Sequence, residues 1–97
     1  MTSKQRAYLK SLAANRESLY QIGKGGITPK VIQTLDEALT ARELIKVTLH
    51  ETSPEEPDKT GKTLAEALTC EIVQIIGRKA VLYRKNGEHP KIVLPGE

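Results

Sequence analysis

Apolar residues recur at helical spacing in three segments of this 97-residue chain, roughly 3–14, 29–41 and 59–69. In each segment leucines and alanines lie three or four positions apart, which places them on one face of a helix. In the third segment, the residues expected to be buried are Leu64, Ala67 and Leu68. The pattern therefore predicts three amphipathic helices.

Residues that favour helix starts precede the first two segments. The hydroxyl of Ser3 can cap the first helix by accepting a hydrogen bond from a free amide of its first turn. Thr28 is a good N-cap for the second helix. Pro29 fits the position after it, because the first helical residue has no use for an amide N–H.

Between and after these helices, the pattern indicates strands. "SLYQI" (18–22) is rich in β-forming residues, and "ELIKVTLHE" (43–51) alternates, with Ile45, Val47 and Leu49 on one face. "EIVQIIG" and "AVLYRKN" (71–77 and 80–86) lie on either side of a short turn, which predicts a hairpin. The apolar "IVL" at 92–94 is expected to dock in an extended form.

The predicted order of elements is α-β-α-β-α-β-β. Strands that are joined through helices are usually parallel, with right-handed crossovers, and the final hairpin adds an antiparallel strand. We therefore expect an α+β fold with two layers and a mixed four-stranded sheet. The length favours a single domain over residues 1–97.

Charge is spread unevenly along the chain, although the net charge is only +3. Residues 1–30 carry six basic side chains against one acidic, residues 31–70 carry four against eight, and residues 71–97 carry five against three. If the two ends meet in the fold, they form a positive face that would attract polyanions. A merely solvated surface is the alternative, and charge alone does not separate the two.

Glycines are concentrated in the segment "QIGKGGITPK" (21–30), between the first predicted strand and the second helix. Glycine permits a positive φ and lets another backbone approach closely. A helix N-terminus presents free N–H groups and the positive end of its dipole. With Lys24 at the tip and Lys30 in the next turn, the arrangement favours an anion, most often a phosphate. A GxxG loop of this kind clamps the nucleic-acid backbone in KH domains.

Several segments together resemble the CRM-domain (YhbY-like) family of RNA-binding proteins. These are "IGKGGIT" before a helix, "ELIKV" on the second strand, then "IVQIIGRKAVLYR" and "KIVLP", in the family's order and spacing. The resemblance implies a fold similar to the C-terminal domain of bacterial translation initiation factor three. It also implies RNA binding and association with precursors of the large ribosomal subunit.

By position, the family's GxxG motif falls on residues 23–26, with Lys24 as its basic member. The family's "LYR" falls on Leu82, Tyr83 and Arg84. Where the family commonly has Thr-Gly before the third strand, this chain has Thr69 followed by cysteine. This departure leaves the end of the third helix open.

Other chemistry is weakly supported. The segment 60–63, "TGKT", imitates the end of a P-loop, but Glu56 stands where that motif needs a glycine. His50 and His89 have no partner at metal-ligand spacing and are expected on the surface. Cys70 has no neighbour in sequence that would activate it. We therefore expect no catalytic centre, no metal and no cofactor.

Aromatic side chains are scarce: the chain has three tyrosines, no phenylalanine and no tryptophan. A platform that stacks bases needs several aromatic faces. Tyr20 is expected in the core, while Tyr83 could lie either in the core or against RNA. Recognition of backbone and shape in structured RNA is therefore favoured over base reading.

The sequence thus predicts a non-catalytic RNA-binding protein that holds structured, ribosomal RNA during large-subunit assembly. The residues expected to bind RNA are Gly23, Lys24, Gly25, Gly26, Lys30, Arg6, Lys10, Arg84 and Arg78. Arg84 could instead brace the fold through a carboxylate. The alternative function is a protein-interaction module whose acidic middle segment contacts a basic ribosomal protein. A chain without a long apolar run or an apolar leader, and with one cysteine, is expected in the cytoplasm.

Overall fold

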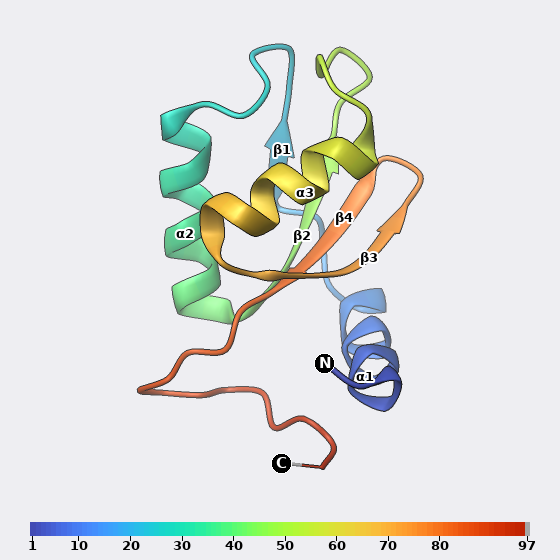
Figure 1. Ribbon diagram of the computed structural model, residues 1–97, viewed down its shortest axis with the longest axis vertical. Helices are drawn as coiled ribbons and strands as arrows, with labels where there is room; N and C mark the ends of the chain where they lie inside the picture. The colour runs from blue at the N-terminus through green and yellow to red at the C-terminus, as the bar shows by residue number, and fades with distance from the viewer. Residues whose placement is uncertain (97) are drawn as a thin grey trace.

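The computed structural model describes residues 1–96 and contains three helices and four strands in the predicted order (Figure 1). The elements are α1 (Ser3–Ala14), β1 (Tyr20–Ile22), α2 (Pro29–Arg42), β2 (Leu44–Leu49), α3 (Pro57–Leu68), β3 (Glu71–Ile76) and β4 (Lys79–Tyr83). As expected, Thr28 caps α2: its side-chain oxygen accepts from the Val31 amide at 3.1 Å.

The four strands form one mixed sheet in the order β1-β2-β4-β3. β1 is parallel to β2, while β4 is antiparallel to both β2 and β3. The strands joined through helices therefore run in the same direction, and β4 lies between β2 and β3 in the opposite direction. This confirms the predicted mixed sheet. The likeness to initiation factor three stays a prediction.

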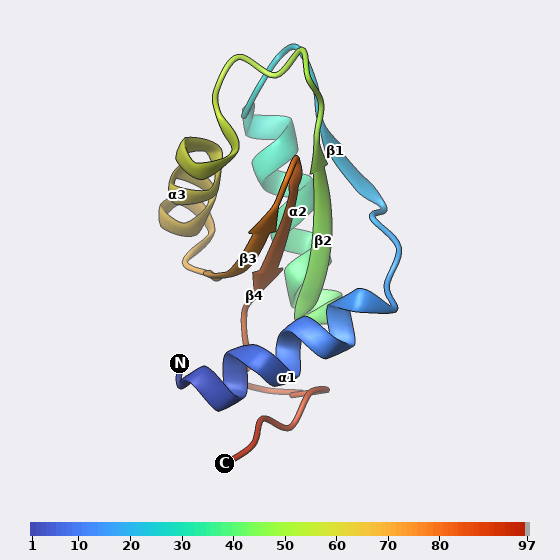
Figure 2. The same cartoon turned by 90° about the vertical axis from the view of Figure 1, so that its right-hand side faces the viewer.

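α2 and α3 cover one face of the sheet, as Figure 2 shows from the side. Leu35 and Leu39 of α2 and Leu64 of α3 are buried in this layer. The sheet contributes Ile22, Ile45, Val47, Leu49, Ala80 and Leu82. Each fully buried leucine or isoleucine stabilises the fold by about 1.5–3 kcal/mol, so this layer is the main core.

α1 and the C-terminal tail cover part of the opposite face. Leu9 of α1 packs in one cluster with Ile92 and Leu94 of the tail and with Val81 and Tyr83 of β4. The predicted docking of the tail is confirmed, and both termini lie at the same end of the molecule (Figures 1 and 2). Tyr83, which the sequence left open, is a core residue.

A buried carboxylate fastens the tail to the end of α2. Glu43 is fully buried and accepts hydrogen bonds from the amides of Asn86 (2.7 Å), Lys91 (2.6 Å) and Ile92 (2.8 Å). Burial alone would raise the pKa of Glu43, but these three bonds and the charge of Lys85 hold the pKa below its usual value. We call this arrangement the Glu43 anchor.

Three local predictions were wrong or incomplete. Thr2, not Ser3, caps α1, forming a capping box with Gln5. Ala67 is exposed. The inner face of α3 instead buries Thr60 and Gly61, and a Cβ at Gly61 would lie 3.0 Å from Ile75, so glycine allows this close packing.

The end of α3, which the sequence left open, lies at Leu68. Thr69 follows it in the left-handed conformation, with φ 50°. The family commonly has Thr-Gly where this chain has Thr69 followed by Cys70. A threonine in that conformation carries backbone strain of about 1–3 kcal/mol.

Candidate nucleic-acid interface

The glycine loop, residues Gly23–Gly26, joins β1 to the segment before α2. The Gly26 amide donates to the Gly23 carbonyl at 2.9 Å, which closes a tight turn with Lys24 and Gly25 at its corners. Both corner residues are exposed, and the loop projects at the end of the molecule away from the termini (Figure 1). The turn therefore presents its backbone outward.

The three glycines of this loop have different roles. Gly26 has φ 67°, and a Cβ there would lie 2.9 Å from Cγ of Pro54, so the fold itself requires glycine. Gly23 and Gly25 do not have a positive φ. A Cβ at Gly23 would meet nothing within 4 Å, and one at Gly25 would lie 3.9 Å from the Thr28 methyl. At these two positions the fold leaves open space, and a ligand could approach the backbone closely.

Hydrogen-bond donors of the loop remain available. Within residues 1–96, the amides of Lys24 and Gly25 donate to no protein group, and Lys24 forms no ion pair. The start of α2 offers less than the sequence suggested, because the Thr28 side chain already binds the Val31 amide and Pro29 has no N–H. The loop amides and Lys24, with Lys30 nearby on α2, are the donors left for an anion.

Arg78 fixes the base of the glycine loop. Its Nε donates to the Leu49 carbonyl at 2.8 Å, and its Nη2 donates to the His50 carbonyl at 2.6 Å. The His50 amide in turn donates at 2.9 Å to the carbonyl of Ile22, the last residue before the loop. Arg78 therefore positions the strand end from which the loop projects.

Arg84 braces the elements at the other end of the sheet. Its Nη1 lies 2.8 Å from both the Asp36 carboxylate and the Leu68 carbonyl. Its Nη2 donates to the Asp36 carbonyl and the Thr40 hydroxyl. One guanidinium thus ties β4 to α2 and to the end of α3, which agrees with the bracing role considered from the sequence.

The two predicted α1 residues lie apart from the glycine loop. Arg6 donates to the carbonyls of Ile72 and Val73 at 2.6 and 2.8 Å, where a bulge interrupts the pairing of β3 with β4. Lys10 is exposed on α1, at the terminal end of a molecule 39 Å long. The structure thus groups the loop with Lys30, and the RNA contacts assigned to Arg6, Lys10, Arg78 and Arg84 stay predictions.

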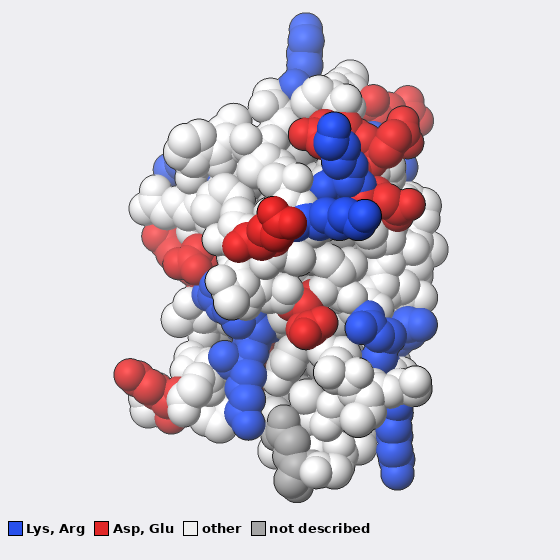
Figure 3. All heavy atoms as spheres, in the orientation of Figure 1, with Lys and Arg blue, Asp and Glu red and all other residues white. Residues whose placement is uncertain are grey.

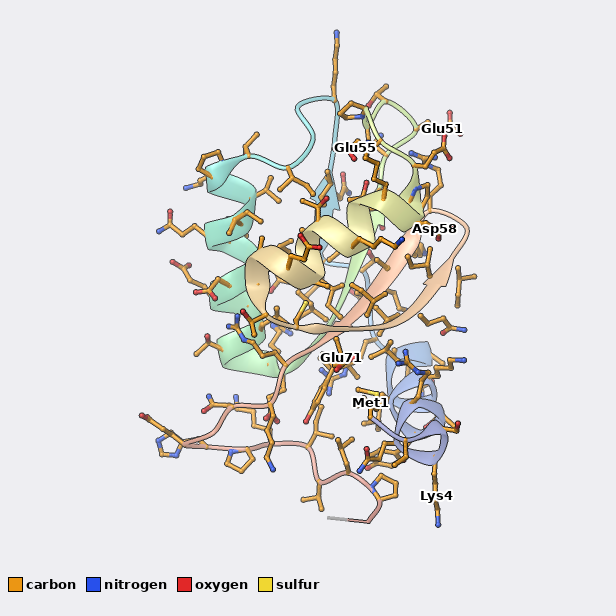
Figure 4. The ribbon with its side chains drawn as sticks, viewed as in Figure 1. Met1, Lys4, Glu51, Glu55, Asp58 and Glu71 are labelled. Atoms are coloured by element: carbon orange, nitrogen blue, oxygen red, sulfur yellow. The ribbon has the colours of Figure 1, made fainter. Side chains whose placement is uncertain are left out.

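Acidic residues border one side of the glycine loop. Glu51, Glu55 and Asp58 lie together around the β2–α3 connection and the first turn of α3 (Figure 4). Figure 3 shows acidic side chains gathered at the loop end of the molecule with basic side chains between them, and Lys59 forms an ion pair with Glu55 at 3.8 Å. Pro54 of this connection contacts Gly26. A polyanion that reaches the loop would therefore avoid this side.

The remaining candidates agree with their expected structural roles. His50 and His89 are exposed, and Tyr20 is partly buried against the main core. Burial raises the pKa of the Cys70 thiol to about 11, which makes it unreactive. Within residues 1–96, no cluster of His, Cys, Asp or Glu could hold a metal ion. In the same residues, no helix combines the length and apolar character needed to cross a bilayer.

Comparison with known proteins decides the family. Residues 1–84 match the CRS1/YhbY (CRM) domain. The chain belongs to the CRM-domain family. Its relatives include the probable RNA-binding protein YqeI of Bacillus subtilis, 37% identical over 98% of this chain and 99% of the relative. An RNA-binding protein of Haemophilus influenzae is 33% identical over 98% and 95% of the two chains.

A solved structure gives the same assignment. The solution structure of SAV1595 from Staphylococcus aureus, described as a candidate RNA-binding protein, has a TM-score of 0.82 and 43% sequence identity. The match covers 98% of this CRM-domain chain and 99% of the other. At this identity, the shared fold and the family are both secure.

Proposed function

We propose that this CRM-domain protein binds RNA without catalysis and holds the RNA backbone with the glycine loop. The observation that carries the proposal is the exposed turn in which the Lys24 and Gly25 amides and the Lys24 ammonium group have no partner among residues 1–96. Open space at Gly23 and Gly25 allows a phosphate to reach those amides. The relatives support the same function, since they are named as RNA-binding proteins.

A double substitution tests the glycine loop. Lys24→Asp with Gly25→Asp places two negative charges where the phosphate would lie, and we expect RNA binding to be abolished. The fold should survive, because Gly25 has no positive φ and its Cβ direction is open. The matched control is Lys62→Asp with Thr63→Asp on the exposed face of α3, which changes the net charge equally. Undiminished RNA affinity in a loop variant with normal circular dichroism would contradict the proposal.

We further propose that the RNA is ribosomal and that the protein acts on precursors of the large subunit in the cytoplasm. A loop that binds backbone phosphates needs RNA that ribosomal proteins have not yet covered, and maturation would close that surface. A sucrose gradient of cell extract at low and moderate salt, probed for this protein, tests the idea. We expect co-migration with large-subunit precursors. Co-migration only with small subunits, or with no ribosomal particle, would refute the assignment.

The acidic patch of Glu51, Glu55 and Asp58 favours a second candidate function, docking of a basic ribosomal protein. Purified protein and protein-free ribosomal RNA separate the two functions. Binding of bare RNA supports the first. If the protein binds ribosomal particles but not bare RNA, and replacing these three acids by their amides abolishes that binding, the second function is correct.

A further inference from the structure

The free edge of the sheet beside the glycine loop has the features of a nucleic-acid groove. In the part of the chain that the structure describes, β1 is an edge strand, paired only with β2. Two hollows lie along it and share Leu19 and Tyr20 in their walls. The upper hollow, about 220 Å³, lies between β1 and α2 and includes Lys30. The lower hollow, about 290 Å³, lies where β1 and β2 begin.

The lower hollow is cationic. Arg16, Arg42 and Lys46 line it, against the single carboxylate of Glu17. Arg16 also donates to the Leu44 carbonyl at 2.8 Å, which fixes its guanidinium beside the hollow. Within residues 1–96, Arg42 and Lys46 form no ion pair. These groups were not singled out from the sequence, because they come from three separate segments: the α1–β1 connection, α2 and β2.

The upper hollow offers backbone groups that can read a base. The Ile22 carbonyl accepts from the His50 amide, so the backbone groups of Ile22 face the β2 side. Neighbouring residues of a strand direct their N–H and C=O groups to opposite sides, so those of Gln21 face the free edge. One outward donor beside one outward acceptor matches the Watson–Crick edge of an unpaired base. Leu19, 53% exposed, and Val31 give the hollow apolar walls for the ring.

We propose that a single-stranded RNA segment leaves the glycine loop and follows the free edge of β1. One base enters the upper hollow and pairs with the Gln21 backbone, and a further phosphate lies between Arg42 and Lys46. The acidic patch on the other side of the loop favours this direction. At ~3.3 Å per residue, the four steps from Tyr20 to Lys24 span at most ~13 Å, so the segment is a few nucleotides long. This inference rests on the RNA binding proposed above.

Charge favours RNA over a protein strand as the occupant. A peptide that adds to a sheet edge binds through a row of main-chain hydrogen bonds. β1 has only three residues, and only Gln21 directs both of its backbone groups outward. Cations at both ends of the edge, with apolar walls between them, suit a segment that carries phosphates and bases.

The charge test removes Arg42 and Lys46 together. Binding of fluorescent random-sequence 12-nucleotide RNA to Arg42→Gln with Lys46→Gln should weaken by about fivefold or more. The negative slope of log affinity against log salt concentration should become shallower by about 1 to 2. The control is Lys59→Gln with Lys62→Gln on α3, which removes the same charge and should leave both quantities near wild type.

The backbone test uses proline at an edge position. Gln21→Pro removes the outward N–H, and an edge strand tolerates proline there. We expect about fivefold to tenfold weaker RNA binding, since one hydrogen bond is lost. Gln21→Ala keeps the N–H and should bind like wild type. If the proline variant misfolds, photocrosslinking of 4-thiouridine RNA to the wild-type protein replaces it, and the crosslinks should map to residues 19–21.

The outcomes separate this inference from the proposed function. If the loop variant loses RNA while the Arg42/Lys46 variant binds normally and no crosslink falls on residues 19–21, the edge path is wrong and loop binding stands. If the wild-type protein binds no RNA, both the edge-path inference and the proposed function are wrong. If an acidic peptide such as oligoglutamate binds this edge and RNA does not displace it, the occupant is a protein and the inference is overturned.

Discussion

The glycine loop and the Glu43 anchor both present backbone amides, and they differ in what those amides donate to. In the anchor, a carboxylate of the same chain accepts from three amides and is fully buried. In the loop, the amides of Lys24 and Gly25 donate to nothing within residues 1–96, and both residues are exposed. The amides of the anchor are satisfied within the chain, whereas those of the loop are open to a ligand.

The arginines show the same contrast. Arg6, Arg78 and Arg84 direct their guanidinium groups at carbonyl oxygens and, for Arg84, at Asp36. Lys24 and Lys30 are exposed and form no ion pair within residues 1–96. These three arginines hold the fold through fixed partners, while the cations nearest the glycine loop are lysines. Substitutions should therefore divide cleanly into those that affect stability and those that affect binding.

The largest effect is expected at the anchor. Glu43→Gln puts an amide group where three N–H groups need acceptors, and we expect a loss of about 3–5 kcal/mol in the free energy of unfolding. Urea unfolding measures this loss. Glu37→Gln on the exposed side of α2 is the control and should change stability by less than about 0.5 kcal/mol. Equal stability of both variants would show that the anchor contributes nothing.

A pair of alanine substitutions should separate the two functions of glycine within one loop. Gly26→Ala puts a side chain on a residue with positive φ and brings its Cβ too close to Pro54. The free energy of unfolding should therefore fall by about 1–3 kcal/mol. Gly25→Ala should keep its stability but weaken RNA binding, because the methyl group occupies the side where the phosphate approaches. Thermal unfolding and RNA titration of both variants measure the two effects. If both variants lose stability and neither changes RNA affinity, the proposed difference between Gly25 and Gly26 is wrong.

Acid should weaken the Glu43 anchor. The pKa of Glu43 is lower in the folded protein than its ordinary value of 4.5, so the folded state binds fewer protons. The contribution of Glu43 to stability is then fully present above about pH 4.5 and is lost as the pH falls through the lower folded pKa. Unfolding curves from pH 7 downward should show this loss in the wild type. Glu43→Gln should show a smaller dependence over the same range.

The smallest effect concerns salt. Four to six basic groups that neutralise phosphates would give RNA affinity a log–log salt slope of roughly −3 to −5. Lys24→Ala should make that slope shallower by about 1 and leave the urea midpoint unchanged. Titrations at several potassium chloride concentrations measure the slope. A flat response in the wild type would indicate apolar or protein-mediated binding instead.

Local signals in the sequence were sufficient to predict the order of the helices and strands and the position of the glycine loop. Thr28, Pro29 and the glycines act over a few residues, so their structural effects could be predicted without knowledge of the fold. The cap at Thr2 was missed because Ser3, its neighbour, is an equally good capping type. Ala67 was assigned wrongly, and burial of Gly61 was not predicted, because the contact between α3 and Ile75 decides which face of the helix turns inward.

Long-range polar contacts could not be read from the sequence. The partners of Arg6 are carbonyls freed by a bulge 66 and 67 residues away, and those of Arg84 include the end of α3. Glu43 looked like the first residue of a strand, and only the returning tail shows it as a buried carboxylate. The cationic hollow was missed for the same reason, since Arg16, Arg42 and Lys46 meet only in the folded chain.

The central place of β4 determines when a newly made chain can finish folding. Within residues 1–96, β3 pairs only with β4, while β2 pairs with β1 and β4, so β3 has no strand partner and β2 has one free edge until residues 79–83 have left the ribosome. The site for α1 is also incomplete until then, because Val81 and Tyr83 belong to it. A nascent chain that stalls before β4 therefore exposes unpaired strand edges, which favour aggregation. Steady translation through the codons of β4 should accordingly increase the yield of folded protein.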